Sequence, residues 1–161
     1  MNKAIFDKDE SNKTITVTRK YDVPRSKVWE AWTTSELLQK WWGPEPWKAI
    51  TKSFEFKEGG HWLYAMTGPE GEKHWAILEY LTINPEDSFT ARDAFCDEEG
   101  VVNTELPNND WQTVFKETDG GTTVIVTIVF ASAEDMKKLT EMGFEEGFTM
   151  GLDQLEALLT E

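Results

Sequence analysis

The sequence predicts an α+β protein in which an antiparallel sheet wraps one long C-terminal helix and leaves a pocket between them. Two observations lead to this fold class. Residues 132–161 carry apolar side chains at helical spacing and contain no proline. Residues 47–130 show strand-and-turn patterns and no helical period of comparable length. A sheet of this kind needs a partner for its apolar face, and the helix is the element that can supply one.

The C-terminal helix is expected to begin at Ser132, because its hydroxyl can accept a hydrogen bond from a free amide near Asp135. At 1.5 Å per residue, about 28 residues reach roughly 42 Å, which is enough to cross a small sheet. The apolar stripe recurs at spacings of three and four and consists of Leu139, Met142, Phe144, Phe148, Leu152, Leu155, Leu158 and Leu159.

Three glycines, Gly143, Gly147 and Gly151, lie four residues apart within this predicted helix. Each costs about 1 kcal/mol relative to alanine in a helix interior. One interpretation is a bend or the close approach of another segment, for which a missing side chain leaves room. The other is that the missing side chains form part of the pocket volume.

The N-terminal part is expected to supply one strand and two short helices. Residues 1–12 are interpreted as a flexible lead-in, followed by a half-buried strand over 14–21 that alternates apolar and polar residues. Arg19 falls on its apolar face and is expected at the sheet rim or paired with an acid. Short helices are predicted over 25–32 and 35–41, before an aromatic loop rich in proline.

Six further strands complete a predicted sheet of about seven strands in a single domain, residues 13–161. Short turns join them, so neighbours are expected to be antiparallel. The predicted strands cover residues 47–56, 61–67, 73–83, 87–96, 111–117 and 122–130.

Composition excludes several functions. The net charge of −14 argues against binding to nucleic acid or to anionic membranes, since both need basic surfaces. Cys96 is the single cysteine, so no internal disulfide can form. The polar start of the chain predicts no signal peptide or membrane span, and a cytoplasmic location follows by default. Eight tryptophans suit either a core or a pocket for aromatic or lipid-like ligands.

Three stretches together resemble a known family: Val23-Pro24-Arg25-Ser26-Lys27-Val28-Trp29, Trp41-Trp42-Gly43-Pro44, and Gly143-Phe144-Glu145-Glu146-Gly147 through Leu152-Asp153-Gln154-Leu155. In their order and spacing, residues 13–160 resemble a START-like (SRPBCC) helix-grip domain. Within that superfamily the chain is most similar to the family named after the activator of the ninety-kilodalton heat-shock protein ATPase.

This resemblance implies a curved sheet that grips the C-terminal helix around a cavity, and a small hydrophobic ligand in that cavity. It also implies a heat-shock chaperone as a partner and a role in the stress response. The co-chaperone that gives the family its name carries a separate N-terminal chaperone-binding domain. This chain has no room for one, which argues against ATPase activation. Many stand-alone members have no known role, and either a monomer or a homodimer is compatible with the sequence.

Catalytic motifs are absent from the sequence: no Gly-x-Ser-x-Gly motif and no phosphate-binding loop occur. We therefore predict no catalytic residues and no cofactor. The two histidines, His61 and His74, lie in neighbouring predicted strands, but a metal site would also need a carboxylate ligand, and none is predicted.

Glu79 is the acidic residue whose position matters most for function. It alternates with Trp75, Ile77, Leu81 and Ile83, so an inward phase makes it a buried carboxylate with a raised pKa. The opposite phase buries the other face of the strand and leaves Glu79 in water; the sequence leaves both open. Asp93, between apolar neighbours, raises the same question more weakly.

Aromatic residues complete the predicted site. Trp41, Trp42 and Trp47 are expected either to form a lid over the pocket or simply to cover one end of the helix. The candidate ligand-binding residues are Trp42, Trp47, His61, Trp62, Tyr64, Trp75, Glu79, Gly147, Phe148 and Gly151. The first hypothesis is a non-enzymatic binding module. The second is a chaperone-interacting protein, and the third is a cyclase- or hydrolase-type enzyme that uses Glu79 or a histidine.

Overall fold

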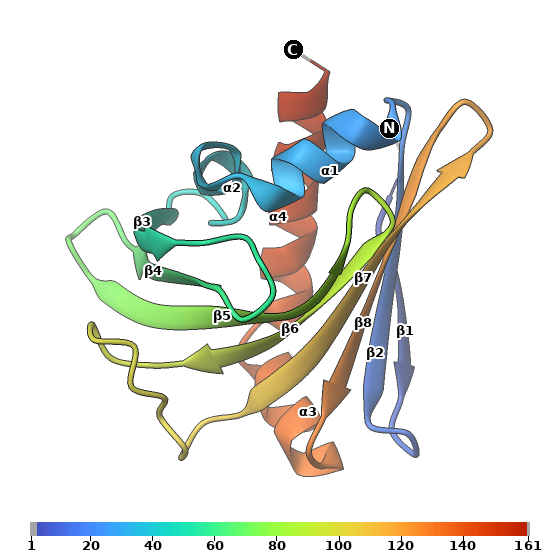
Figure 1. The fold of residues 1–161 in the computed structure, drawn as a ribbon. Coiled ribbons are helices and arrows are strands. Elements are labelled where there is room, and N and C mark those ends of the chain that lie inside the picture. The colour runs from blue at the N-terminus through green and yellow to red at the C-terminus, as the bar shows by residue number, and fades with distance from the viewer. Residues whose placement is uncertain (1–2, 161) are drawn as a thin grey trace.

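The computed structural model describes residues 3–160 and shows one curved, eight-stranded antiparallel sheet with four helices (Figure 1). The strands follow each other across the sheet in the order β1-β2-β8-β7-β6-β5-β4-β3, so β1 and β3 are its edges. The strands are β1 (Ile5–Asp9), β2 (Thr14–Tyr21), β3 (Lys48–Phe54), β4 (His61–Thr67), β5 (Lys73–Asn84), β6 (Ser88–Phe95), β7 (Asn108–Thr118) and β8 (Gly121–Phe130).

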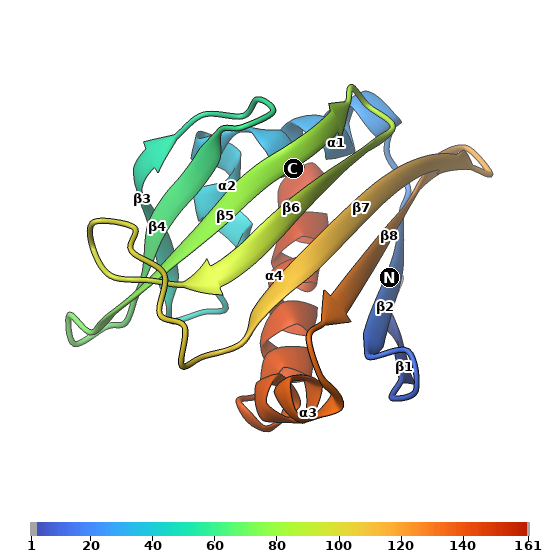
Figure 2. The same cartoon turned by 60° about the horizontal axis from the view of Figure 1, so that its bottom comes forward.

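All four helices lie outside the run from β3 to β8. Helices α1 (Arg25–Thr33) and α2 (Ser35–Trp41) connect β2 to β3, and α3 (Ala133–Glu141) and α4 (Phe144–Leu159) follow β8. Figures 1 and 2 show α4 running along the concave side of the sheet, with α1 and α2 beside its C-terminal end and α3 at the other end. The predicted α+β architecture, with a C-terminal helix held by the sheet, is therefore confirmed.

Arg19 is one of the links between the sheet and α4. Its side chain is 1% exposed, and its guanidinium lies 2.7 Å from Asp153 Oδ1 and 3.3 Å from Glu156 Oε1. A buried cation is tolerated only when paired, so the prediction of an acidic partner is confirmed and the prediction of a rim position is wrong.

The C-terminal segment differs from the single helix that was predicted. It begins as expected, since Ser132 Oγ accepts a hydrogen bond of 3.0 Å from the Asp135 amide. However, Gly143 adopts a left-handed conformation with φ of 86°, which ends α3 and starts α4 in a new direction. Residue 161, the last of the predicted helix, lies outside the described residues.

The lead-in is the second difference. Residues Ile5–Asp9 form strand β1, which pairs antiparallel with β2, from Ile5 opposite Thr18 to Asp9 opposite Thr14. Residues 5–9 of the predicted flexible lead-in thus form a strand, and the sheet has eight strands instead of about seven. Polar and acidic residues are usual on an edge strand, and they hid this one from pattern analysis. Residues 1 and 2 lie outside the described part of the chain.

The other two glycines lie against the loop that follows α2. A β-carbon at Gly151 would lie 3.1 Å from the carbonyl oxygen of Trp41, whereas one at Gly147 would lie 3.8 Å from Pro44 Cγ, an ordinary contact. Close approach is therefore confirmed at Gly151, and a bend at Gly143.

Because only Gly151 is in close contact with backbone, replacement by alanine is expected to have opposite effects on stability at Gly147 and Gly151. Gly147→Ala is expected to raise the free energy of unfolding by about 0.5–1 kcal/mol, because it improves helix propensity without a clash. Gly151→Ala gains the same propensity but presses on a backbone carbonyl, so we expect a net loss of stability. Urea unfolding of both variants checks this; equal stabilisation of the two would contradict it.

Candidate functional site

Register places side chains from three strands in one row on the concave face. Tyr64 on β4 lies opposite Ala76 on β5, and Ala76 lies opposite Phe95 on β6. The pair Met66 and His74 flanks this row toward the end of the strands. Successive residues of a strand point to opposite faces, so these five side chains share the concave side.

This row forms one wall of a pocket of about 390 Å³ that is open to solvent. Pro44 and Trp47, from the loop after α2, and Met142, from the junction of α3 and α4, complete it. The pocket thus lies at one end of the space between sheet and helix. Its lining residues are Pro44, Trp47, Tyr64, Met66, His74, Ala76, Phe95 and Met142.

Gln154 on α4 holds the pocket loop in place. Its Nε2 donates to the carbonyl oxygens of Trp41 (2.9 Å) and Gly43 (2.8 Å), and its Oε1 accepts from the amide of Glu45 (3.0 Å). The Trp47 ring then lies 5.6 Å from the ring of His74 across the pocket. Because one side chain satisfies three backbone groups, the aromatic loop has a defined position on the helix.

Five of the predicted site residues lie in or directly behind this pocket. Trp47 and Tyr64 line it. Behind them, Trp42 donates its indole N–H to Tyr64 Oη at 2.9 Å, and Trp62 stacks on Tyr64 with ring centroids 4.1 Å apart. Phe148 lies one layer further in, 6.1 Å from the Trp42 ring.

The two predicted glycines support the pocket from the helix. Gly147 faces Pro44, which lines the pocket, and Gly151 faces the end of α2. Only at Gly151 does the missing side chain permit a close approach of the loop to α4, and neither glycine lines the pocket itself.

Three predicted site residues lie away from this pocket, on the outer, convex face. His61 bonds to Ser53 Oγ at 2.7 Å, Trp75 lies under the Lys52 ammonium at 5.8 Å, and Glu79 is exposed. In β5 the inward residues are Ala76, Leu78 and Tyr80, which is the alternative phase left open by the sequence.

The sequence left the inward face of β5 ambiguous because this strand carries apolar residues on both faces. The convex face of β4 and β5 is itself partly covered by the acidic loop after β6: a β-carbon at Gly100 would lie 3.7 Å from Ile77 and 3.8 Å from Leu63. A strand that carries apolar residues on both faces loses the alternation that shows which side is inward.

Asp93 is the carboxylate that does point inward. It lies opposite Leu78 and Asn109, in the row next to the pocket wall, and it is half-buried. Burial raises its pKa to about 6. The indole of Trp111 offsets part of this rise, although its N–H does not reach the carboxylate with hydrogen-bond geometry. The charge of Asp93 in turn adds to the effect of burial in raising the pKa of Tyr64.

The sequence did not identify most of the pocket wall. Nothing in the sequence distinguishes five of the apolar lining residues from core residues: Pro44, Met66, Ala76, Phe95 and Met142. His74 was considered only as a metal ligand together with His61, and the two histidines lie on opposite faces of the sheet. The available signal was register: once β4, β5 and β6 are paired correctly, the row containing Tyr64 follows.

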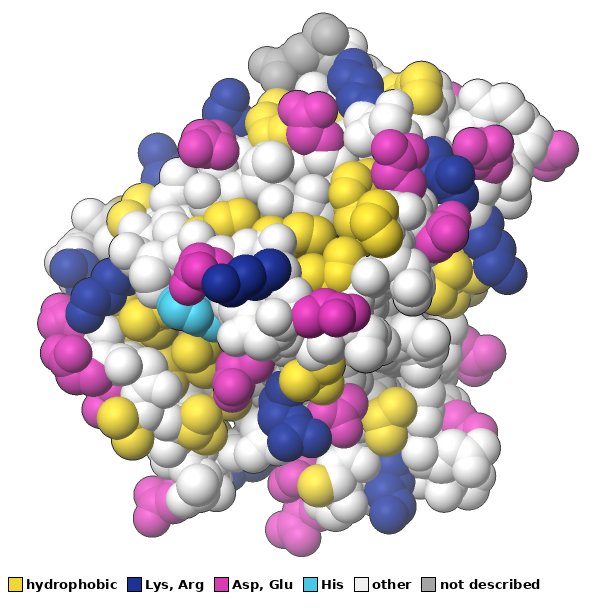
Figure 3. Space-filling view, in the orientation of Figure 1, with side chains coloured by type: hydrophobic (Ala, Val, Ile, Leu, Met, Phe, Trp, Pro, Cys, Tyr) yellow, Lys and Arg dark blue, Asp and Glu magenta, His cyan; other side chains and the backbone are white. Residues whose placement is uncertain are grey.

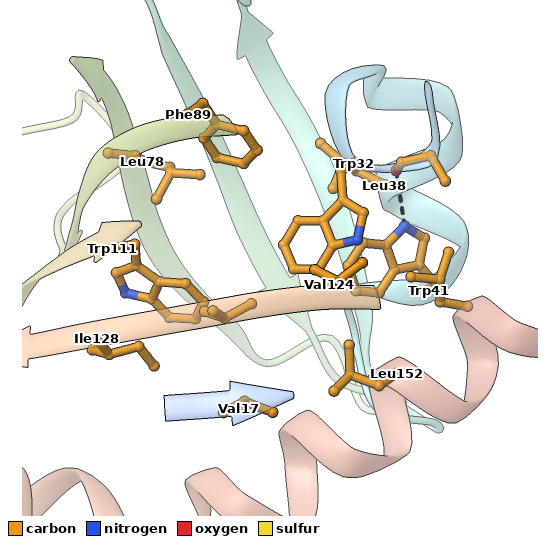
Figure 4. Packing of buried hydrophobic residues seen from close by; sticks show 14 of the residues in the cluster. Val17, Trp32, Leu38, Trp41, Leu78, Phe89, Trp111, Val124, Ile128 and Leu152 are labelled. Atoms are coloured by element: carbon orange, nitrogen blue, oxygen red, sulfur yellow. Dashed lines mark hydrogen bonds between the residues drawn. The ribbon is translucent and has the colours of Figure 1, made fainter. Parts of the chain in front are cut away.

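Deeper between sheet and helix, aromatic side chains fill the space. Trp32, Trp41 and Trp42 pack edge to face, with Trp32 and Trp41 centroids 4.8 Å apart. Figure 4 shows Trp32 and Trp41 between the two short helices and Leu152 of α4, with Trp111 on the sheet side. A void of only about 10 Å³ remains among these rings.

Comparison with known proteins agrees with this architecture. Residues 22–160 match the family described as Activator of Hsp90 ATPase homolog 1-like protein. The chain belongs to this family. Its START-like fold is one that commonly binds hydrophobic ligands, and none of the curated proteins matches the chain.

Solved structures of three bacterial proteins are similar over almost the whole chain. Protein Ms6760 from Mycobacterium smegmatis is 33% identical, with a TM-score of 0.89 over 96% of this chain and 95% of that one. A protein from Arthrobacter aurescens is 32% identical, with a TM-score of 0.91 over 97% and 91% of the two chains. One from Staphylococcus epidermidis is 30% identical, with a TM-score of 0.85 over 96% and 93%.

Two further properties concern the helices and the surface of this family member. Among its described residues, no helix is both long enough and apolar enough to cross a membrane. Figure 3 shows acidic and basic side chains interspersed over one face, with hydrophobic side chains exposed between them.

Proposed function

We propose that this protein binds a small, uncharged apolar or aromatic molecule in the pocket between Trp47 and the Tyr64 row. The observation that supports this is the pocket itself, about 390 Å³ and lined mainly by aromatic and apolar side chains. Pockets of 300–1,000 Å³ with such linings are typical of small-molecule sites.

The chemistry of the lining favours a neutral ligand. The eight lining residues include no lysine or arginine, so the wall has no permanent positive charge to balance a carboxylate or phosphate. Asp93 lies behind the wall, and the whole chain carries a net charge of −14, which disfavours anions further. Trp47, Tyr64, His74 and Phe95 offer ring faces and edges to an aromatic ligand.

Binding of the neutral dye N-phenyl-1-naphthylamine tests this proposal. We expect its fluorescence to rise on titration with the protein, and the melting temperature to rise with it. Trp47→Ala is expected to weaken binding at least about tenfold, because it removes one side of the pocket.

Trp75→Ala is the matched control, since this tryptophan is also half-buried but lies on the convex face. It should leave dye affinity unchanged. Equal loss of binding in the two variants, or no binding by the unaltered protein, would count against the pocket.

The family description supports a second candidate, a protein that contacts the heat-shock ATPase. Co-precipitation of the two purified proteins tests it, and no binding at micromolar concentration would reject it. For the enzyme hypothesis, Glu79 lies on the convex face, away from the pocket, whereas Asp93 lies on the concave face in the row beside the pocket wall.

A further inference from the structure

Asp93 lies in the row of side chains directly behind the pocket wall. On β6 it precedes Phe95 by two residues, and it lies opposite Leu78 on β5, which follows Ala76 by two. Phe95 and Ala76 both line the pocket. Side chains two residues apart in a strand point to the same face and lie roughly 7 Å apart. The Asp93 carboxyl is therefore one layer of side chains away from the space for the ligand.

Solvent still reaches the Asp93 carboxyl. The residue is half-buried and its side chain points to the concave face, so its exposed part lies in the space between the sheet and α4. Aromatic rings fill the inner part of this space, where Trp111 lies 5.9 Å from Trp42 and 5.7 Å from Phe148. The pocket lies at the outer end, so the water that solvates Asp93 belongs to the same space as the pocket.

The charge of Asp93 depends on this water. Burial raises the pKa of the carboxyl to about 6, and the Trp111 indole offsets part of the rise. No basic side chain contributes, and within residues 3–160 Asp93 forms no ion pair. A carboxylate without a cationic partner is stable in a protein only while solvent reaches it.

The elements packed around Asp93 present uncharged side chains to it. Its neighbours across the strands are Leu78 on β5 and Asn109 on β7. Trp111 follows Asn109 by two residues on β7, and from α4 the ring of Phe148 packs against Trp111. None of these groups can replace the water around the carboxylate as a source of positive charge.

Three ionisable groups lie near Asp93 or in the pocket wall. Burial, together with nearby acids that include Asp93, raises the pKa of Tyr64 and of Cys96, so both stay neutral below pH 8. His74 lines the pocket and gains a positive charge as the pH falls. A charge in the lining disfavours a neutral apolar ligand, so His74 acting alone would weaken binding in acid.

We propose that Asp93 couples ligand binding to pH: the pocket binds its neutral ligand more tightly when the Asp93 carboxyl carries a proton. An apolar ligand in the pocket displaces water that solvates this carboxyl, and the charged form loses more by this than the neutral form. By linkage, such a ligand binds the protonated protein more tightly and takes up a proton on binding. This inference rests on the proposed function, since it concerns the occupant of the same pocket.

The expected pH dependence has one direction. Well below pH 6 the Asp93 carboxyl is already protonated, so the affinity is at its highest and does not change with pH. The affinity falls as the pH rises through about 6, because the carboxyl must then be neutralised for tight binding. It levels off at higher pH, where the ligand binds to the charged form. The protein therefore retains its ligand in acid and releases it more readily at neutral pH.

Titration with the neutral dye N-phenyl-1-naphthylamine from pH 5 to pH 8 tests the coupling. We expect the dissociation constant of the unaltered protein to be about fivefold lower at pH 5 than at pH 8. Asp93→Asn keeps the shape of the protonated carboxyl and stays neutral. It should bind the dye at pH 8 as tightly as the unaltered protein does at pH 5, with no fall in affinity as the pH rises.

Proton uptake on binding is a second readout. Calorimetric titrations at pH 6.5, in buffers of different ionisation enthalpy, should show that the unaltered protein takes up part of a proton for each dye molecule bound. Asp93→Asn should show no uptake.

Glu79→Gln is the matched control. It makes the same change in net charge on the neighbouring strand β5, but Glu79 is exposed on the convex face, away from the pocket. This variant should keep the fivefold pH dependence. Its loss in Glu79→Gln would assign the effect to net charge and would refute the role of Asp93.

The outcomes separate the two proposals. If the dye binds equally well at pH 5 and pH 8, if it binds more tightly at pH 8, or if Asp93→Asn keeps the fivefold fall in affinity, the coupling is refuted and the pocket stands. If the dye does not bind at any pH, the proposed function fails, and the coupling fails with it.

Discussion

Replacing Trp41 with alanine is expected to lower the free energy of unfolding by about 3–5 kcal/mol. Trp41 is 0% exposed and packs edge to face on Trp32 and Trp42. Its indole N–H donates to the Ala31 carbonyl at 3.0 Å, which ties α2 to α1. The substitution therefore removes a large buried ring, leaves a cavity and leaves a buried carbonyl unpaired.

Urea unfolding followed by circular dichroism measures this effect. Trp41→Phe keeps most of the ring and is expected to cost clearly less, so it gives a measurable value even if the alanine variant does not fold. Trp75→Ala, on the convex face, is the control and should cost less than about 1.5 kcal/mol. Similar, small losses for Trp41→Ala and Trp75→Ala would show that Trp41 behaves as a surface lid and not as core.

Replacing Asp93 with asparagine is expected to stabilise the protein by roughly 2 kcal/mol at pH 8 and to have little effect at pH 4. The pKa of Asp93 rises from 3.8 to about 6 on folding, because the half-buried carboxyl loses solvent. At 1.36 kcal/mol per unit this corresponds to about 3 kcal/mol, which partial solvent access reduces.

The direction of the pH dependence follows from proton binding. Between pH 3.8 and 6 the folded protein retains a proton on Asp93 that the unfolded chain has released. The contribution of this group to stability is therefore fully present below pH 3.8, and is lost as the pH rises through about 6. An amide in its place stays neutral throughout and should remove this step.

The free energies of unfolding of the unaltered protein and of Asp93→Asn are measured from pH 4 to pH 8. In the difference between the two curves, the contributions of most other titrating groups cancel. Glu79→Gln is the control, because Glu79 lies on the neighbouring strand but is exposed on the convex face; its difference curve should be flat. A flat curve for Asp93→Asn as well would show that the Asp93 carboxyl is not disfavoured by burial.

Local pattern determined most of the secondary structure. The 35–41 helix and the 14–21 and 61–67 strands have the predicted bounds, and the Ser132 cap forms as expected. These elements depend on nearest neighbours in the chain: a capping hydroxyl, an apolar repeat or a turn glycine. The aromatic content also pointed correctly to a space between sheet and helix that is rich in tryptophan.

Only the tertiary structure decided which face of each strand is inward and which tryptophans are core. β5 carries apolar side chains on both faces, so its alternation was uninformative, and Glu79, His61 and Trp75 proved to lie outside. Edge strand β1 depends on the backbone partner that β2 offers, and on contacts of Phe6 with Phe144 and of Lys8 with Glu145, both distant in sequence. The pocket wall joins residues from β4, β5, β6 and two loops. Such a site depends on strand register and on Gln154 holding a distant loop, contacts that no local stretch of sequence encodes.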